Sequence, residues 1–189
     1  MRTTTHALFT ILFLFMGLSL LAQQPTKPKK DTTSTDTTTM QGGGGGTGAA
    51  MPYTAGYSSQ FAIGNPEHAR MVLTLWKDWD ENMLDRNMAM MADTITMETA
   101  DGQVIRGRDS VMNAFKQVRG QYTTVKSTVD VYMPVRSTDR NEDWVLIWGR
   151  EEDTNASGTT TKIIHEIWRI NRDGKIDYMS QYIAKPPVR

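Results

Sequence analysis

The feature that most limits how this chain can fold is a long polar stretch in its first third. Residues 23–64 contain TTSTDTTT and then GGGGG, with almost no apolar side chain before Met51. Such a composition cannot bury enough apolar surface to offset the entropy lost on ordering, and a glycine run makes it flexible. We therefore predict a disordered Thr/Gly-rich tether over 23–64. Residues 65–189 are then left to form one domain of ordinary size.

The apolar run before the tether predicts export. Residues 7–22 read ALFTILFLFMGLSLLA behind Arg2 and the amino terminus. The run has the length of a signal-peptide core and falls short of the ~20 residues of a spanning helix. We expect residues 1–22 to be a signal peptide cleaved after Ala22, and the mature protein to be periplasmic or extracellular without stable membrane insertion. An uncleaved anchor is the alternative, because lysines follow the run closely.

Charge and composition argue against several classes of function. The formal net charge is zero and the basic residues do not cluster, so a nucleic-acid partner is not expected. The chain has no cysteine, which excludes disulfides, thiol nucleophiles and zinc–thiolate sites. Its three histidines form no HExxH motif, and its glycine run follows no predicted strand. We predict neither a metal nor another cofactor.

From residue 66 the pattern changes to that of a globular domain. Pro66 after Asn65 is typical of a helix start, and apolar side chains at three- and four-residue spacing continue to Met83. Further elements are expected as helices at 87–92 and 109–119, short strands at 95–99 and 103–106, and long strands at 125–133, 143–152, 160–171 and 175–184. This order predicts an α+β domain in which three N-terminal helices cover one face of an antiparallel meander.

Two segments resemble a known family. Residues 76–111 (WKDWDENMLDRNMAMMADTITMETADGQVIRGRDSV) and residues 166–176 (EIWRINRDGKI) resemble the NTF2-like superfamily, in particular its SnoaL-like branch. The shared features are paired aromatics on a helix, Asp93 before a strand, an Asp-Gly…Arg-Gly-Arg-Asp run, and a closing Asp-Gly-Lys-Ile turn. The likeness spans about residues 67–185. It implies a cone-shaped, strongly curved antiparallel sheet around a pocket, closed by the first helices and often dimeric through its outer face.

The family implies no single activity. Its members include steroid isomerases, polyketide cyclases, dehydratases and binding or assembly modules without chemistry, so the fold does not choose the function. In cyclases of the SnoaL-like branch the last strand carries a His-Trp-Asp-like run whose Asp is an acid or base. Here the matching positions hold Met179 and Gln181. Because glutamine cannot accept and release a proton as a base does, cyclase-type chemistry is not expected.

Glu166 is the main candidate for a chemical role. Strand alternation places it on one face with Ile164 and Trp168, and His165 with Ile163 and Ile167 on the other. If the first face lines the pocket, Glu166 lies beside an indole with little water, its pKa rises, and it becomes a usable acid or base. A structural pair with an arginine or a tyrosine hydroxyl is the alternative.

A second acid and several apolar side chains complete the candidate site. Asp80 follows Trp79 and would point from the helix into the cone, unless it is simply solvated. We expect the ligand-binding wall to be formed by Trp79, Trp148, Trp168, Met179 and Gln181. Aromatic and thioether walls suit a flat apolar ligand, whereas a filled core is the other interpretation. The acidic run at 151–153 is predicted to be a solvated strand end.

Three functions stay open at this point. The first is the binding of a small apolar or aromatic molecule, and the second is a cofactor-independent lyase or isomerase that uses Glu166 with Asp80 or tyrosine hydroxyls. The third is a dimerising interaction module with a filled interior. In each case the apolar outer face around Ile163 and Ile167 predicts a homodimer.

Overall fold

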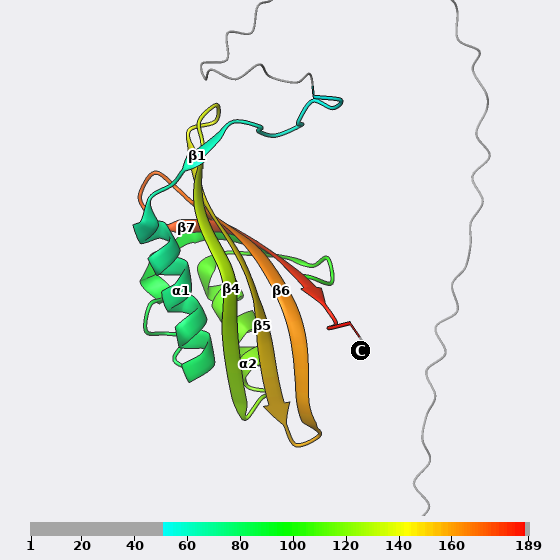
Figure 1. The fold of residues 1–189 in the computed structure, drawn as a ribbon. Helices are drawn as coiled ribbons and strands as arrows, with labels where there is room; N and C mark the ends of the chain where they lie inside the picture. Colours follow the sequence, from blue (N-terminus) through cyan, green and yellow to red (C-terminus); the bar gives the residue numbers. More distant parts are fainter. Residues whose placement is uncertain (1–50, 188–189) are drawn as a thin grey trace, which may run out of the picture. The chain divides into compact units, whose positions relative to one another are not determined.

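A computed structural model describes residues 51–187. The predicted signal peptide and residues 23–50 of the predicted tether lie outside the described residues. Residues 51–187 contain helices α1 and α2, one 3-10 turn, and seven strands in a single curved sheet ordered β1-β4-β5-β6-β7-β2-β3 (Figure 1). The predicted α+β architecture, with helices and one strongly curved sheet, is confirmed. Among these residues, no helix is both long enough and apolar enough to span a membrane.

The elements have the following bounds. The helices are α1 (Pro66–Glu81) and α2 (Arg108–Arg119), and the 3-10 turn η1 is Met88–Met90. The strands are β1 (Phe61–Ile63), β2 (Met91–Glu98), β3 (Val104–Arg106), β4 (Thr124–Ser137), β5 (Glu142–Asn155), β6 (Gly158–Ile170) and β7 (Ile176–Ala184).

Helix α1 begins where its sequence predicts. The Asn65 side chain accepts a hydrogen bond from the Glu67 amide at 3.0 Å, and Pro66 occupies the first turn, where no amide donor is required. The helix ends at Asn82 in the left-handed conformation, with φ 56°. One face of the helix is buried, and Val72 and Trp76 on that face belong to the main apolar core.

The prediction of a helix at 87–92 is wrong. Only Met88–Met90 form a 3-10 turn, and Met91 already begins β2. Methionine and alanine favour helices locally, but Met91 and Ala92 are buried as strand residues and Met91 pairs with Ile176 of β7. Long-range pairing therefore overrides the local preference. The β2–β7 pair is also parallel, so the otherwise antiparallel sheet is mixed.

The predicted boundary of the tether also changes. Phe61–Ile63 form β1, which pairs antiparallel with Val135–Ser137 of β4, so ordered structure begins before residue 65. Tyr57 packs edge-on against Trp144, with 5.9 Å between the ring centroids. Strand β1 is only three residues long and exposed, and its order depends on the free edge of β4, which no local sequence pattern reveals.

The sheet has a covered inner face and an open outer face. On the inner face Val145, Ile147, Ile164, Trp168 and Ile170 are buried and belong to the same apolar core as the inner faces of α1 and α2. The long strands β4, β5 and β6 bend together (Figure 1), and β4 has a register shift between Val129 and Val131, as expected where a sheet curves. This bend forms the hollow in which the candidate site lies.

Candidate functional site

A cavity of about 530 Å³ lies between the inner face of the sheet, the two helices and the β2–β3 hairpin. A volume of this size is typical of small-molecule sites. Most of its wall is apolar and comes from both helices and from strands β2, β3, β6 and β7, with Leu75, Trp76, Met91, Met97, Phe115 and Met179 among the lining residues. The interior is therefore not a completely filled core.

Glu166 lies on the inner face of β6 and is almost completely buried, with 5% of its surface exposed. Its Oε2 atom accepts hydrogen bonds from Trp76 Nε1 at 2.7 Å and from Trp168 Nε1 at 3.1 Å. Its Oε1 atom accepts one from Gln181 Nε2 at 2.8 Å. Because Trp76 is on α1, Gln181 on β7 and Trp168 on β6 itself, three elements hold the carboxyl group in one orientation.

Burial raises the pKa of Glu166. The three donors, from Gln181, Trp76 and Trp168, lower it, but they are neutral and offset the desolvation only in part. A carboxyl oxygen has two lone pairs, and Oε1 accepts a single hydrogen bond within the described part of the chain. Glu166 can therefore present either a proton or a free lone pair to a molecule in the cavity.

A second polar group lies along the same cavity. Glu151 on β5 and Lys162 on β6 are cross-strand partners, and both line the cavity. Glu151 Oε2 accepts a hydrogen bond from Trp79 Nε1 at 2.7 Å, and its Oε1 lies 3.5 Å from Lys162 Nζ. Lys162 also forms an ion pair with Asp153, which is 1% exposed.

The electrostatics of this group follow from its burial. Burial, followed by the nearby negative charge of Asp153, raises the pKa of Glu151 to about 7. Lys162 and the Trp79 indole oppose that rise. For Lys162 burial lowers the pKa, but Asp153 and Glu151 outweigh it and the net direction is upward. The ammonium therefore stays charged, whereas Glu151 titrates near neutral pH.

The solvated strand end predicted at 151–153 is wrong for two of its three residues. Strand β5 continues to Asn155, so alternation turns Glu151 and Asp153 inward and only Glu152 outward. Three consecutive acids look solvated when they are read as a run. The signal that identifies the inner pair is the period of two from Val145 and Ile147, together with Lys162 in the facing strand.

The other predicted site residues separate into two groups. Trp79, Trp168, Met179 and Gln181 lie on the cavity wall, and their role in ligand binding stays a prediction. Trp148 does not, because it pairs with His165 on the outer face and stacks on it, with ring centroids 4.5 Å apart. The sequence placed His165 outside correctly, but it left the register between β5 and β6 open.

Asp80 has a structural contact instead of a place on the cavity wall. Its Oδ1 atom accepts hydrogen bonds from the Ser127 amide at 3.0 Å and from the Ser127 hydroxyl at 2.7 Å. The contact joins the end of α1 to β4. The acid that α1 contributes to the wall is Asp78, which is 1% exposed and accepts a hydrogen bond from Asn87. Asp78 precedes the cavity-lining Trp79, and no local sequence pattern indicates that it is buried.

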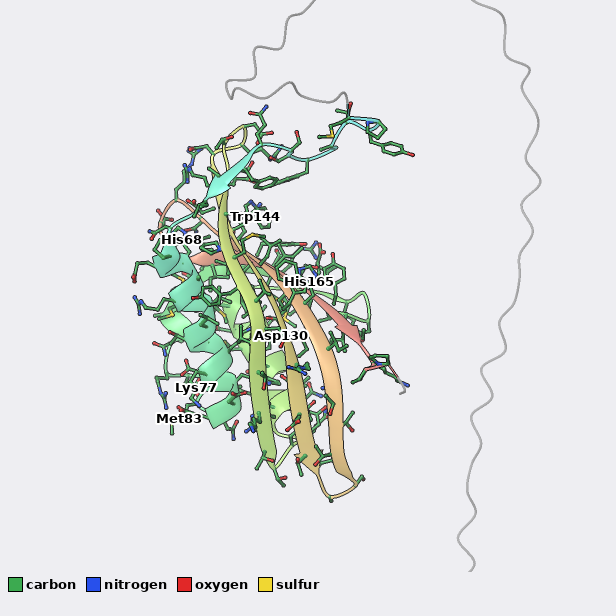
Figure 2. All side chains as sticks on the ribbon, in the orientation of Figure 1. His68, Lys77, Met83, Asp130, Trp144 and His165 are labelled. Carbon is green, nitrogen blue, oxygen red and sulfur yellow. The ribbon has the colours of Figure 1, made fainter. Side chains whose placement is uncertain are left out.

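The outer face carries a row of stacked rings. Trp148, His165 and Tyr182 follow one another across β5, β6 and β7. The His165 and Tyr182 rings also stack, with 5.7 Å between their centroids, and burial lowers the pKa of His165. Figure 2 locates His165 and Trp144, both on this face. The row is separate from the cavity because its side chains point to the opposite side of the sheet.

Comparisons with known proteins identify the fold. No protein-family model and no curated protein matches the sequence, but solved structures do. One is an NTF2-like protein of unknown function from Exiguobacterium sp. 255-15, with a TM-score of 0.52 and 21% identity over 60% of this chain and 98% of that one. A putative SnoaL-like polyketide cyclase from Jannaschia sp. CCS1 has a TM-score of 0.54 and 11% identity, over 62% and 85%.

A third similar structure contains a ligand. It is Mycobacterium tuberculosis RV0760c in complex with estradiol-17beta-hemisuccinate, with a TM-score of 0.51 and 17% identity over 61% of this chain and 92% of that one. At such identities the likeness concerns the fold. The chain has the NTF2-like fold, which it shares with SnoaL-like proteins, and the resemblance found in the sequence is confirmed at that level.

Proposed function

We propose that this domain is exported and binds a small, uncharged apolar or aromatic molecule in its cavity, with Glu166 as the polar anchor. The observation that carries the proposal is a buried carboxyl group, held by three donors and with one position free, in an apolar cavity of about 530 Å³. Burying a carboxyl group costs free energy that neutral hydrogen-bond donors offset only in part, and a role in ligand binding accounts for its position. The steroid nucleus of the ligand in RV0760c supports a flat apolar ligand, and its hemisuccinate arm, which ends in a carboxylate, is not part of this proposal.

A binding assay with the neutral, flat dye Nile red tests this proposal. Wild type should bind one dye per domain in a saturable manner. Ile164→Phe adds bulk to the cavity wall, because Ile164 is 3% exposed and lines the cavity, and should weaken binding at least about tenfold. Ile163→Phe is the matched control, since Ile163 lies on the outer face. Unchanged binding to Ile164→Phe would refute the proposal.

A second candidate is a cofactor-independent lyase or isomerase. The observation in its favour is that two carboxyl groups with raised pKa, Glu166 and Glu151, line one cavity. Such groups can move protons near neutral pH. Under this reading a neutral cyclic ketone should exchange its α-protons in D₂O with wild type and not with Glu166→Gln. Equal exchange rates with both proteins would reject the role of Glu166.

The interaction-module proposal rests on the outer face. Val131 and Tyr182 are each about half exposed beside the partly buried Trp148 and Ile167. Apolar side chains gathered on one face favour a protein contact. We propose a two-fold homodimer through this face, whatever the cavity binds.

A further inference from the structure

The cavity has a polar group at each of two separate places along β6. Lys162, Ile164 and Glu166 point to the same face because strand side chains alternate, and all three line the cavity. Lys162 and Glu166 are four residues apart, which corresponds to about 13 Å along a strand. Ile164 lies between them and is 3% exposed. Along β6 the cavity wall therefore has two polar groups, which we call the Lys162 end and the Glu166 end, with an apolar residue between them.

The Lys162 end presents a donor beside an acceptor. Lys162 Nζ is ion-paired with Asp153, whereas its distances to Glu151 Oε1 and Tyr122 Oη are 3.5 and 3.4 Å. These two contacts are long for hydrogen bonds, so the ammonium has donor capacity left. Trp79 holds Glu151 through Oε2, which leaves Oε1 available. A hydroxyl group, which both donates and accepts, matches this pair.

Charge excludes other groups at the same end. Two carboxyl groups, Glu151 and Asp153, surround the single ammonium, and Asp78 and Asp101 also line the cavity. A carboxylate or phosphate would meet these acids in a partly desolvated site, where like charges are costly. An ammonium group would lie against the Lys162 ammonium, whose ion pair is already with Asp153, and Glu151, with a pKa of about 7, is only partly ionised to offset that repulsion. An uncharged oxygen group avoids both penalties.

The Glu166 end accepts the same kind of group. Oε1 accepts one hydrogen bond, from Gln181, and has a second position for a ligand. When protonated it can donate to a carbonyl or hydroxyl, and when ionised it can accept from a hydroxyl. Both ends thus favour uncharged oxygen groups, and the distance between the two ends sets the length that the ligand must have.

We propose that the ligand is an elongated, uncharged molecule with an apolar middle and a hydroxyl or carbonyl group at each end. One end binds Glu166, and the other binds between Lys162 and Glu151. This inference rests on the proposed binding function and adds the class of ligand to it. It predicts that the second oxygen group adds affinity only when the molecule is long enough to reach both ends.

Isothermal titration calorimetry with four simple probes, two diols and the two matching alcohols, tests this expectation. α,ω-Decanediol should bind about tenfold more tightly than decanol, because its second hydroxyl gains hydrogen bonds to a charged group. Hexanediol, which is too short to span about 13 Å, should show no such gain over hexanol. Equal affinities for decanediol and decanol would overturn the two-ended ligand while leaving the binding function intact.

Two variants locate the effect. Lys162→Gln combined with Asp153→Asn replaces the buried ion pair by a neutral pair of similar size and should reduce the decanediol advantage to less than about twofold. Lys126→Gln with Glu152→Gln is the control, because it neutralises an exposed cross-strand pair. The advantage should survive there. An advantage that also persists in the Lys162 variant would overturn the placement of that end.

The outcomes also distinguish a failure of the two-ended ligand from a failure of the proposed binding function. If Nile red binds in the cavity but decanediol has no advantage over decanol, the two-ended ligand is wrong and the binding function stands. If Ile164→Phe leaves dye and alcohol binding unchanged, the cavity is not the binding site and both proposals fail.

Discussion

Replacing Glu151 by glutamine removes a titratable group from the cavity wall while keeping its size. The Glu151 side chain is 9% exposed, and its Oε2 atom accepts the Trp79 indole hydrogen bond, which an amide oxygen can also accept. Burial and the charge of Asp153 raise the pKa of Glu151 from its ordinary value of 4.5 to about 7. The substitution therefore changes how stability depends on pH more than it changes contacts.

The sign of the effect follows from proton linkage. Between these two pKa values the folded protein holds a proton that the unfolded chain has released, so folding takes up a proton there. The stabilisation is fully present below pH 4.5 and is lost as the pH rises through about 7. At about 1.4 kcal/mol for each pH unit, the loss over this interval is about 3 kcal/mol. The stability of Glu151→Gln does not depend on pH in this way, because glutamine does not titrate.

Urea unfolding followed by tryptophan fluorescence measures the difference. The free energy of unfolding of wild type should fall by about 3 kcal/mol relative to Glu151→Gln between about pH 4.5 and pH 8. Glu152→Gln, at the exposed neighbouring position, should follow wild type throughout. If the curves for wild type and Glu151→Gln run parallel over this range, Glu151 does not titrate as the structure implies and the reasoning is refuted.

Three further predictions concern packing, assembly and export. Gly149→Ala should lower the free energy of unfolding by about 1–3 kcal/mol in thermal unfolding, because the new Cβ would lie 2.6 Å from the Thr128 carbonyl oxygen and 3.0 Å from the Trp76 ring. Gly56→Ala, with open space around the new Cβ, should leave the stability unchanged. Unchanged stability of Gly149→Ala would contradict this packing. Light scattering at micromolar concentration should find a dimer that Ile167→Lys shifts toward monomer, whereas a monomeric wild type rejects the outer-face contact. N-terminal sequencing of protein from its native host should begin at or near Gln23, and intact Met1 in a membrane fraction would reverse the export prediction.

Much of the fold is predictable because its signals are local. The start of α1 follows from the Asn65 cap and Pro66, and α2 begins one residue from its predicted start. The four long strands were found with ends that differ by only a few residues. Each of these elements has a cap, a turn or a repeat within a dozen residues. The strand β1 and the start of β2 were missed because pairing with distant strands, and no local repeat, orders them.

The candidate site was predictable only in part. Glu166 and Trp168 were placed on one face from the alternation of a single strand, and the structure has both on the cavity wall. Trp148 was misplaced because the faces of β5 and β6 can be matched only when their register is known. Glu151 was missed because three consecutive acids look solvated when they are read as a run, although the period of two from Val145 turns Glu151 inward. The hydrogen bond from Trp76 to Glu166 joins residues 90 positions apart, so no local pattern predicts it.

The sequence by itself determined which residues can share a face and where helices and turns begin, since those properties depend on backbone periods and on neighbouring residues. It also determined that Glu166 and His165 point to opposite sides of β6. Only the tertiary structure decided which side is covered, which acids are desolvated and how the cavity joins Lys162 to Glu166. Those properties arise when strands and helices far apart in the chain exclude water from the same space, and this exclusion shifts the pKa of Glu151 and Glu166.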